Sequence, residues 1–371
     1  MADTSFKMRI IHVSTVHYRY DTRIFLKMCC FLAHNKIDVK LFVADGQGDE
    51  FINGVHIQDV GLSKNRLIRI FYMPIKMFFL CLNQKHSFFH LHDPELLPLG
   101  FVLKLLNKKV IFDSHEDIPK SLYSKHYIKF PFNFILSKLI KYFLELCLPF
   151  FDFTIAATST IKESLPKSCN ILIVNNYPIF EELITNNKDI KRIKCSVCYV
   201  GTITEPRGII ELCKASNLFY KGITLEIVGK IDKEMKYKLD SLTKLDNIKY
   251  HGFLDRKDLA ILLSNCFAGI VTFHNYPNHI NSQPNKLFEY MSAGLATICS
   301  DFPLWRKLIS KHNCGILVDP MSPYDIAQAV NRLFDEKSIA FELGINGKSS
   351  VFNYYNWNSE FKNLLKLYHS L

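Results

Sequence analysis

The sequence predicts an α/β protein of two successive domains, each a parallel sheet covered by helices on both faces. Short strands that are apolar throughout alternate with helical segments, which is typical of parallel sheets buried on both sides. This alternation stops at the polar segment 175–194 and then restarts, and 371 residues exceed one ordinary hydrophobic core. We therefore expect an N-terminal Rossmann-like domain over residues 1–180 and a C-terminal one over 190–352. A terminal helix over 353–371 would pack back toward the first domain.

The elements of the first domain follow from apolar runs separated by polar turns. An apolar run of four to eight residues fits a buried strand, and a longer run with apolar residues three or four apart fits a helix. The predicted strands are Met8–Val13, Val39–Ala44, Phe88–Leu91, Val110–Phe112, Phe153–Ala156 and Ile171–Val174, and the predicted helices include Thr22–Leu32, Leu96–Leu106 and Phe134–Cys147.

The second domain repeats this pattern. Its predicted strands are Val197–Val200, Leu225–Val228, Ile248–Tyr250, Gly269–Thr272 and Ala296–Cys299, and its predicted helices are Ile209–Leu218, Lys257–Ser264, Lys286–Ala293 and Ser322–Asp335. Polar residues collect where the strands of both domains end, for example at His92–Asp93, Asp113–His115 and Gly201–Thr202. Since ligands of open α/β sheets bind beyond the carboxyl ends of the strands, two facing domains would enclose one central cleft.

Composition limits the class of protein. A formal net charge of +11 leaves nucleic acid, anionic lipid and phosphorylated substrates open as partners. The 11 cysteines lie mostly in apolar runs, as reduced thiols of cytosolic proteins do. We find no signal-peptide pattern and no run of roughly 18 apolar residues. We expect a cytoplasmic protein, with a peripheral position at the inner face of the plasma membrane as a further hypothesis.

The segment Asn281–Asp301 is the most informative stretch of the chain. Ser282, Pro284 and Asn285 are residues typical of a helix start, and a polar loop that opens a helix suits a phosphate. Glu289 follows one turn later on an otherwise apolar helix, where two sugar hydroxyls would satisfy its carboxylate. The alternative is an ordinary capped helix with Glu289 facing solvent.

Two clusters at strand ends of the first domain are candidates for contacts with an acceptor or a diphosphate. Asp21 and Arg23 follow the first strand, where they would cap the next helix and pair with each other, or Arg23 would reach an anionic group. His92 and Asp93 end a later strand, with His90 on the same strand face. Because a zinc site needs four ligands in a recognisable spacing, we favour a structural strand end over a metal site.

A third strand end carries His115, which is flanked by carboxylates and can exchange a proton near neutral pH. In the second domain, Arg207 lies beside two glycines in Gly201–Gly208, between a strand and a helix. This segment lacks the ending of a P-loop, but a guanidinium there could bind a diphosphate through two bonds. A surface arginine is the alternative. The first strand is followed by no G-x-G-x-x-G pattern, which weighs against a nicotinamide or flavin enzyme.

Two stretches, Lys64–Lys85 and Lys120–Lys141, interleave basic with aromatic and aliphatic residues. Such stretches bind an anionic membrane face or nucleic acid, or they are ordinary amphipathic helices. No nucleic-acid motif accompanies them, so we expect no nucleic-acid partner.

Together these motifs resemble the family 4 retaining glycosyltransferases, in a branch that serves bacterial surface-polysaccharide synthesis. The most specific match is Pro284–Gly294, reading PNKLFEYMSAG, preceded by Gly201 and by Arg207–Gly208. The N-terminal half fits through His17–Phe25, His92–Glu95 and His115–Glu116. The resemblance spans nearly the whole chain and implies the GT-B fold, in which two Rossmann-like domains hold the active site between them.

The resemblance also implies roles for individual residues. Glu289 matches the second glutamate of the family's E-x7-E motif, which binds the ribose hydroxyls of the nucleotide. Arg207 matches the residue that contacts the donor diphosphate, and His115 the histidine near the transferred sugar. The segment Ser282–Lys286, which includes Asn285, matches the loop whose amides approach the phosphates.

Two positions depart from the family pattern. Asn281 stands where the first motif glutamate is usual, and Thr202 where many members have an arginine. Asn281 can hydrogen-bond a sugar hydroxyl, but its neutral side chain cannot stabilise a developing cation by charge.

We therefore expect an enzyme that moves a sugar, with retention, from a UDP or GDP sugar to a saccharide acceptor on a polyprenyl diphosphate. Arg207, Lys286 and the loop amides would stabilise the departing diphosphate, so neither a metal nor a cofactor is expected. One alternative is a nucleotide-sugar epimerase of the same fold. Another is a non-catalytic basic protein that binds membrane or nucleic acid.

Overall fold

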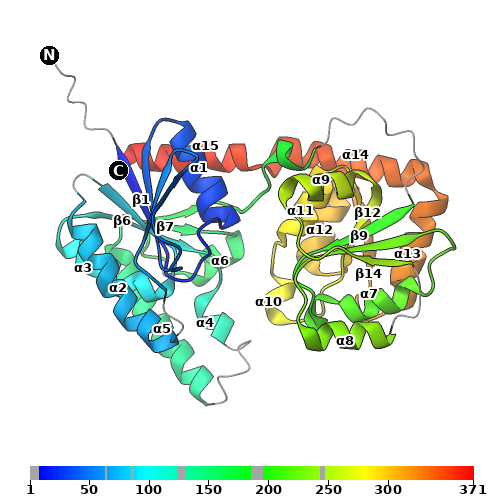
Figure 1. The fold of residues 1–371 in the computed structure, drawn as a ribbon, viewed down its shortest axis with the longest axis horizontal. Helices are drawn as coiled ribbons and strands as arrows, with labels where there is room; N and C mark the ends of the chain where they lie inside the picture. Colours follow the sequence, from blue (N-terminus) through cyan, green and yellow to red (C-terminus); the bar gives the residue numbers. More distant parts are fainter. Residues whose placement is uncertain (1–7, 63–64, 85–86, 123–130, 185–194, 243–246) are drawn as a thin grey trace. The chain divides into compact units, whose positions relative to one another are not determined.

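The computed structural model divides the chain into two compact units, residues 1–176 together with 360–371, and residues 177–359 (Figure 1). It describes residues 8–62, 65–84, 87–122, 131–184, 195–242 and 247–371. Residues 185–194 of the predicted linker, residue 190 at the predicted domain start, Lys64, Lys85 and residues 123–130 of the second basic stretch lie outside the described residues. The first unit ends at Asn176, four residues before the predicted boundary.

The first unit is built on an eight-stranded sheet of order β3-β4-β2-β1-β5-β6-β7-β8. The strands are β1 (Arg9–Val13), β2 (Asp38–Val43), β3 (Glu50–Ile52), β4 (Val55–Asp59), β5 (Ser87–Leu91), β6 (Lys109–Ser114), β7 (Phe153–Ala156) and β8 (Ile171–Ile173). All neighbouring strands are parallel except β3 and β4, which form a hairpin. The sequence prediction lacks this hairpin, although its turn residues Asn53 and Gly54, both at positive φ, are a strong hairpin signal.

Helices cover both faces of this sheet. On one face, α2 (Arg66–Leu82), α3 (Leu97–Leu105) and α5 (Phe132–Cys147) pack into one core with the strands. On the other lie the π-helical segment η1 (Thr22–Cys29), α1 (Cys30–His34) and the C-terminal helix. Short segments complete the unit: η2 (Pro94–Leu96), α4 (Ile118–Ser121), η4 (Leu148–Phe150) and α6 (Ser159–Ser164). The predicted helix Thr22–Leu32 is thus two helical segments in sequence.

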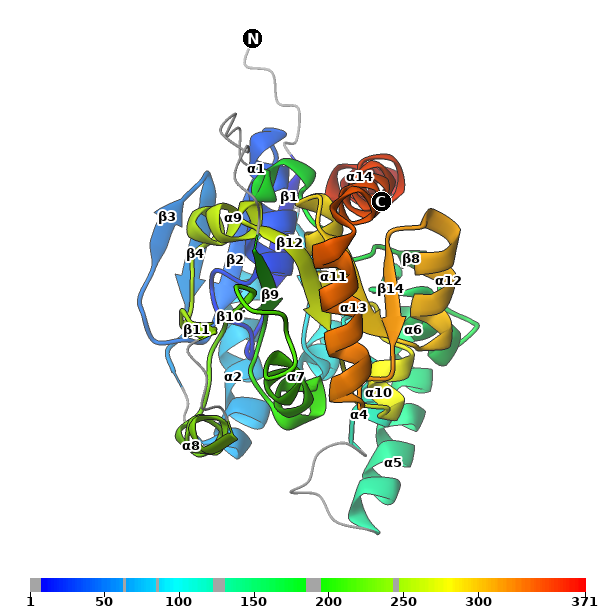
Figure 2. The same cartoon turned by 90° about the vertical axis from the view of Figure 1, so that its right-hand side faces the viewer.

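The second unit has a six-stranded, all-parallel sheet of order β11-β10-β9-β12-β13-β14. The strands are β9 (Ser196–Val200), β10 (Thr224–Val228), β11 (Ile248–Tyr250), β12 (Cys266–Val271), β13 (Ala296–Ser300) and β14 (Gly315–Val318). One core contains α7 (Ile209–Ser216), α8 (Lys233–Leu242) and α13 (Pro323–Asp335). The other contains η5 (Phe180–Leu183), α9 (Arg256–Ser264), α11 (Asn285–Ser292) and α12 (Pro303–His312) (Figure 2).

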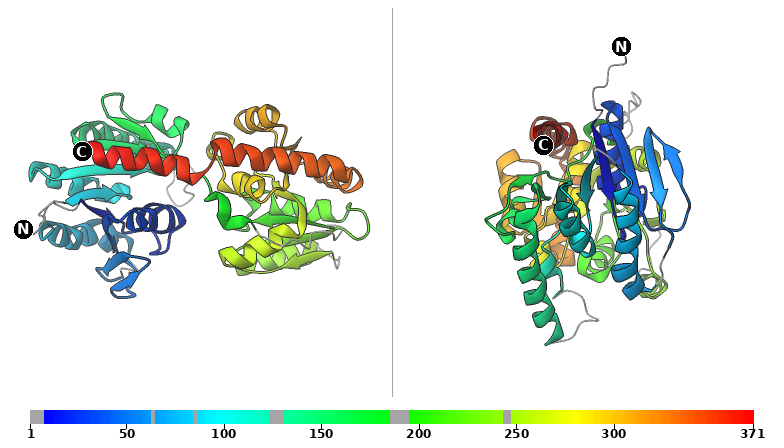
Figure 3. Two further views of the ribbon diagram at one scale, coloured as in Figure 1. Left: turned by 90° about the horizontal axis from the view of Figure 1, so that it is seen from above. Right: turned by 90° about the vertical axis from the view of Figure 1, so that its left-hand side faces the viewer.

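The C-terminal segment differs from the single predicted helix over 353–371. It forms the end of α14 (Lys337–Tyr354) and then a separate helix, α15 (Trp357–Ser370), drawn in orange and red in Figure 3. Asn356 causes the break because its amide donates to the Phe352 carbonyl (2.7 Å) while its oxygen accepts from the Ser359 amide (3.0 Å). From Glu360 onward the chain belongs to the first unit.

Gly269 of β12 permits close packing of α11 on the sheet. A Cβ built there would lie 2.3 Å from the Tyr290 ring, and that ring is fixed because its hydroxyl accepts from the Val200 amide at 2.8 Å. We expect Gly269→Ala to lower the free energy of unfolding by about 1–3 kcal/mol, the cost of overpacking a core. Urea unfolding followed by tryptophan fluorescence measures this, since both tryptophans lie in the second unit. An equal stability for Gly269→Ala and the exposed control Lys307→Ala would contradict the prediction.

Candidate active site

The second unit presents the start of α11 beside the ends of its central strands. A short helix, α10 (Pro277–Ile280), precedes the loop, and α11 follows Pro284 without a side-chain cap. Ser282 was expected to help start α11, but its hydroxyl donates to the His279 carbonyl (2.8 Å) and closes α10 instead. The Leu287 N–H bonds the Pro284 carbonyl at 3.1 Å, and the preceding N–H groups of Asn285 and Lys286 open the helix toward an anion such as a phosphate oxygen.

Glu289 is buried one turn into α11 and does not face solvent. Its Oε1 accepts from Arg256 Nη1 and its Oε2 from Lys286 Nζ, both at 2.9 Å. Burial by itself would raise the pKa of Glu289, but the charges of Lys286 and Arg256 outweigh it and lower the pKa to about 2. The carboxylate is thus ionised at neutral pH, and each oxygen keeps a lone pair that can accept a hydroxyl proton.

Arg256 is a site residue that the sequence analysis missed. It opens α9, and its other terminal nitrogen donates to Glu182 at 2.6 Å, so that it bridges two carboxylates. The pairing joins residues 33 and 74 positions apart. No local pattern in the sequence signals it.

The segment Gly201–Gly208 joins this site through its glycines. A Cβ on Gly201 would lie 3.5 Å from Arg207 Nη1 and 3.9 Å from Lys286 Cε, so both cations border the end of β9. Gly208 adopts φ +74° at the start of α7, where a Cβ would lie 1.8 Å from the Thr272 carbonyl oxygen. Only glycine permits this close approach of loop and strand.

The Arg207 guanidinium lies over the Phe273 ring, 5.6 Å from its centroid. Within the described parts of the chain, it forms no ion pair with a carboxylate, unlike Lys286 and Arg256. Asn285 is the first residue of α11, and Asn281 is exposed at the end of α10. The structure therefore brings Arg207, Lys286 and Glu289 together at the carboxyl edge of one sheet.

In the first unit, Arg23 points into the protein. It does not pair with Asp21 as predicted, but forms two bonds with Asp113 (2.8 and 2.9 Å) and a third with the Val174 carbonyl (2.9 Å). Asp21 does cap the following helix, by accepting from the Arg23 and Ile24 amides. Since both Arg23 and Asp113 are buried, this pair supports the strand ends from below.

Asp93 is also buried and shapes a loop. Its carboxylate accepts from the Ser14 hydroxyl (2.9 Å) and the Thr15 amide (2.6 Å). These bonds hold the turn after β1 against the end of β5. Asp93 thus has protein partners, and its contact with an acceptor or a diphosphate stays a prediction.

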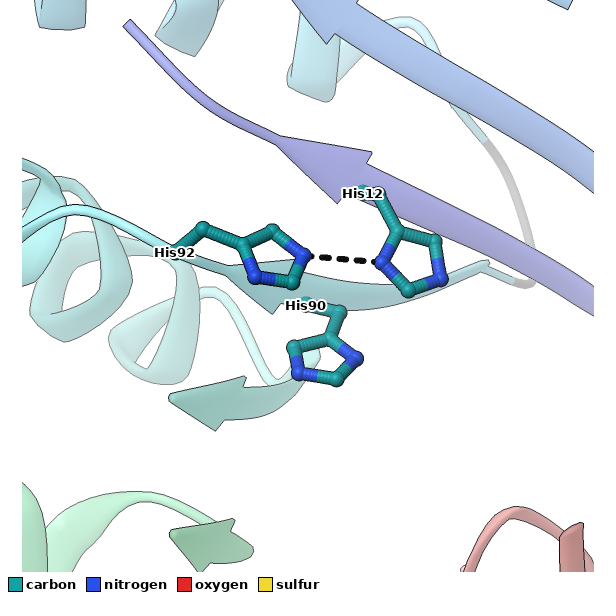
Figure 4. A group of neighbouring side chains, drawn as sticks. All are labelled: His12, His90 and His92. Atoms are coloured by element: carbon teal, nitrogen blue, oxygen red, sulfur yellow. Dashed lines mark hydrogen bonds between the residues drawn. The ribbon is translucent and has the colours of Figure 1, made fainter. Parts of the chain in front are cut away.

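Four histidines form a group behind this edge. His12 of β1, His90 of the neighbouring β5 and His92 just after β5 lie together, and Figure 4 shows the hydrogen bond between His12 Nδ1 and His92 Nε2, which is 2.9 Å long. His92 Nδ1 also lies 3.2 Å from His115 Nε2. Burial lowers the pKa of His12 and His90 well below the usual value, and that of His92 to about 4, so these rings are neutral at pH 7.

Two sets of three ligand atoms in this group are close enough to be considered for a metal ion, His12 with His90 and His92, and His92 with Asp113 and His115. Protein partners already occupy many of these atoms, since His90 Nδ1 bonds the Tyr368 hydroxyl (2.6 Å) and Arg23 holds Asp113. The absence of a metal requirement remains a prediction.

His115 is the most accessible member of the group, with a side chain 20% exposed. Its Nε2 lies 3.2 Å from Asp113 Oδ2, so the carboxylate favours the tautomer with the proton on Nε2. The His17 ring packs beside it, 4.8 Å between centroids. Nδ1 of His115 is then an acceptor suited to a hydroxyl group.

The chain is similar to known glycosyltransferases in sequence and in fold. Residues 180–350 match the family model described as glycosyl transferases group 1. An uncharacterised glycosyltransferase of Methanocaldococcus jannaschii is 23% identical over 293 residues, which cover 74% of this chain and 72% of that protein.

Two solved structures have the same fold over nearly the full length. Sucrose-phosphate synthase from Thermosynechococcus elongatus superposes with a TM-score of 0.76 at 16% identity, covering 98% of both chains. Anabaena HepE, solved in complex with UDP and glucose, superposes with a TM-score of 0.75 at 13% identity, covering 98% of this chain and 100% of that chain.

The fold and these relatives define the chain as a glycosyltransferase with the GT-B fold. Residues 180–350 are similar to the glycosyl transferases group 1, the family 4 that the motifs of the sequence resemble. The predicted fold class and the predicted enzyme class are confirmed. The alternative of a non-catalytic basic binding protein is set aside. Among the described residues, no helix is long and apolar enough to cross a membrane.

Proposed function

We propose that this enzyme moves a sugar from a nucleoside diphosphate donor, of the UDP or GDP type, to a saccharide acceptor with retention. The observation that carries the proposal is the group of Glu289, Lys286 and Arg207 at one sheet edge of the second unit. An ionised buried carboxylate beside two cations suits a ligand that has a diol at one end and a diphosphate next to it. UDP and UDP-glucose bound to HepE support a donor of this kind.

The charges of the site suit departure of the diphosphate. Cleavage of the anomeric C–O bond leaves negative charge on the diphosphate and positive charge on the sugar ring. Arg207 and the first-turn amides of α11 would stabilise the negative charge without a metal. Lys286 would contribute while remaining paired with Glu289, since an ammonium group has three donors.

His115 and Asn281 would act on the transferred sugar. With the Nε2 proton directed at Asp113, His115 accepts a hydroxyl proton through Nδ1 and orients the sugar. Asn281 donates or accepts a hydrogen bond but contributes no charge, so Asp or Glu at this position would not be equivalent to it.

The acceptor in this proposal is a saccharide on a polyprenyl diphosphate, as in bacterial O-antigen, capsule or exopolysaccharide synthesis at the inner membrane face. The resemblance to a surface-polysaccharide branch and the net charge of +11 support it. Stabilisation of the protein by a panel of UDP and GDP sugars, followed by product analysis with lipid-linked saccharides, tests donor and acceptor separately. Conversion of the nucleotide sugar without any acceptor would favour the epimerase instead.

Arg207 provides a direct test of diphosphate stabilisation. We expect Arg207→Ala to lower kcat about 100- to 1,000-fold, the usual effect of removing one donor that stabilises transition-state charge. The matched control is Arg306→Ala, because Arg306 is exposed and paired with Asp301 by 2.7 Å bonds. Equal turnover of Arg207→Ala and wild type, measured by nucleoside diphosphate release, would remove Arg207 from the mechanism.

A further inference from the structure

The first unit carries an unusual number of exposed apolar side chains on the helices of one sheet face. On α2 they follow one side of the helix, with Phe71 at 69% and Phe79 at 61% exposed. On α5 they include Phe132 at 70%, Leu139 at 59% and Tyr142 at 67%. We call this set the apolar face: Phe71, Tyr72, Ile75, Phe79, Phe132, Ile135, Leu139, Tyr142 and Leu146. Exposed apolar surfaces of this extent mark interaction sites.

The helices of the apolar face are neighbours. α3 contacts both α2 and α5, and all three pack into the same core on the same side of the sheet (Figure 1). The helix α2 connects β4 to β5, and α5 connects β6 to β7, all strands of the parallel part of the sheet. A helix that connects two parallel strands begins where the first strand ends, so both helices begin at the carboxyl edge of the sheet. This is the edge at which β6 ends and His115 lies.

The charge of these helices indicates what kind of partner the apolar face binds. The helices α2, α3 and α5 contain six basic residues (Arg66, Arg69, Lys76, Lys104, Lys138 and Lys141) and one acidic residue, Glu145. Glu95 and Asp152 of neighbouring segments pair with Arg69 and Lys104, so the surface still has an excess of positive charge. Lys138 Nζ lies over the Phe134 ring at 4.5 Å and Lys76 Nζ over the Tyr72 ring at 5.3 Å, so cations alternate with aromatic rings. A second copy of this chain would bring the same positive charge against itself, which disfavours self-association.

We propose that the apolar face binds the surface of a bilayer that contains anionic lipids. Helices with exposed Phe, Leu and Tyr beside Lys and Arg lie in the interface plane, with apolar side chains among the acyl chains and cations at the headgroups. Docking in this way lays the sheet of the first unit along the bilayer, with the carboxyl edge and His115 at one side of the contact. The lipid contact stands on the helices alone, whereas its use for a lipid-borne acceptor rests on the proposed function.

Co-sedimentation of the full chain with phosphatidylcholine vesicles, with and without phosphatidylglycerol, tests the proposal. We expect binding to the anionic vesicles only, and a loss of at least about tenfold in Ile135→Ser/Leu139→Ser and in Lys138→Glu/Lys141→Glu. The control is Phe341→Ser/Ile345→Ser, which changes two exposed residues of α14 in the second unit. Light scattering reports the oligomeric state of each variant.

Wild-type protein that ignores anionic vesicles, or α5 variants that bind them as well as the control, would overturn the proposal. An oligomer that the α5 serine variant dissociates, without vesicle binding, would assign the apolar face to a second copy instead. Thermal stabilisation by UDP is expected to be the same in all variants. If UDP does not stabilise the wild-type protein, the proposed donor site is wrong, but the conclusion from the vesicle experiment is unaffected.

Discussion

Replacement of Glu289 by Gln is expected to weaken binding of UDP or GDP by about 100-fold or more. The carboxylate is ionised and buried, and two hydroxyl groups of a ribose would each form a hydrogen bond to a charged acceptor. Such bonds contribute roughly 1.5–3 kcal/mol each, so the loss of two corresponds to at least two orders of magnitude in Kd. Isothermal titration calorimetry, or thermal stabilisation at several nucleotide concentrations, measures the change.

The matched control for this variant is Glu182→Gln. Glu182 is the second carboxylate on Arg256, so this change also deprives Arg256 of a charged partner but leaves Glu289 in place. If both variants bind the nucleotide equally weakly, the effect arises from Arg256 and the ribose assignment is wrong. Unchanged affinity in Glu289→Gln would remove the carboxylate from the site altogether.

Local patterns were sufficient for most of the architecture. Apolar runs predict the parallel strands because both faces of each sheet are buried, and α11 was placed within one residue of its observed ends. The antiparallel hairpin β3–β4 was not predicted because its strands are short and partly exposed. The break between α14 and α15 depends on hydrogen bonds of one side chain, Asn356, inside a segment that otherwise has helical periodicity.

The sequence did not predict those contacts of the site that join side chains far apart along the chain. Glu289 was recognisable as an isolated carboxylate on an apolar helix, but Arg256, its partner, comes from another helix. Arg23 was misassigned to Asp21, two residues away, because sequence proximity suggested a pair. Its actual partner, Asp113, is 90 positions later and reaches it only through the strand order β1-β5-β6.

The first unit is expected to lose stability as the pH falls from about 6.5 toward 4. His12, His90 and His92 are buried as neutral rings with lowered pKa values, so the unfolded chain binds more protons than the folded one in this range. Each such group contributes up to about 1.4 kcal/mol per pH unit between its folded pKa and the unfolded value near 6.5. Hydrogen–deuterium exchange of β1 and β5 peptides follows this loss.

Other groups facing the cluster modify the curve but do not reverse its sign. The Asp113 charge opposes the lowering at all three rings, and it is lost only below the ordinary carboxyl range because the pKa of Asp113 itself is lowered. The pKa of His17 is raised, chiefly by Asp21 and Asp93 against the effect of burial, so this one ring gains charge in the folded state and offsets part of the loss. The hydroxyl of Tyr368, whose pKa burial raises, stays protonated throughout.

One variant and one internal reference test whether the histidine cluster causes this acid sensitivity. His12→Gln keeps a hydrogen-bonding partner for His92 but removes one titrating ring. The free energy of unfolding of the first unit should therefore change less steeply with pH, by roughly the contribution of one histidine. The exposed His34→Gln should leave the slope unchanged. Trp305 and Trp357 both lie in the second unit, where burial also lowers the pKa of two less deeply buried histidines, His279 and His312, so tryptophan fluorescence should show a smaller loss between pH 6.5 and 4. The prediction is contradicted if the free energy of unfolding depends on pH equally in both histidine variants, or equally in both units. The buried rings would then not determine the acid stability of the first unit.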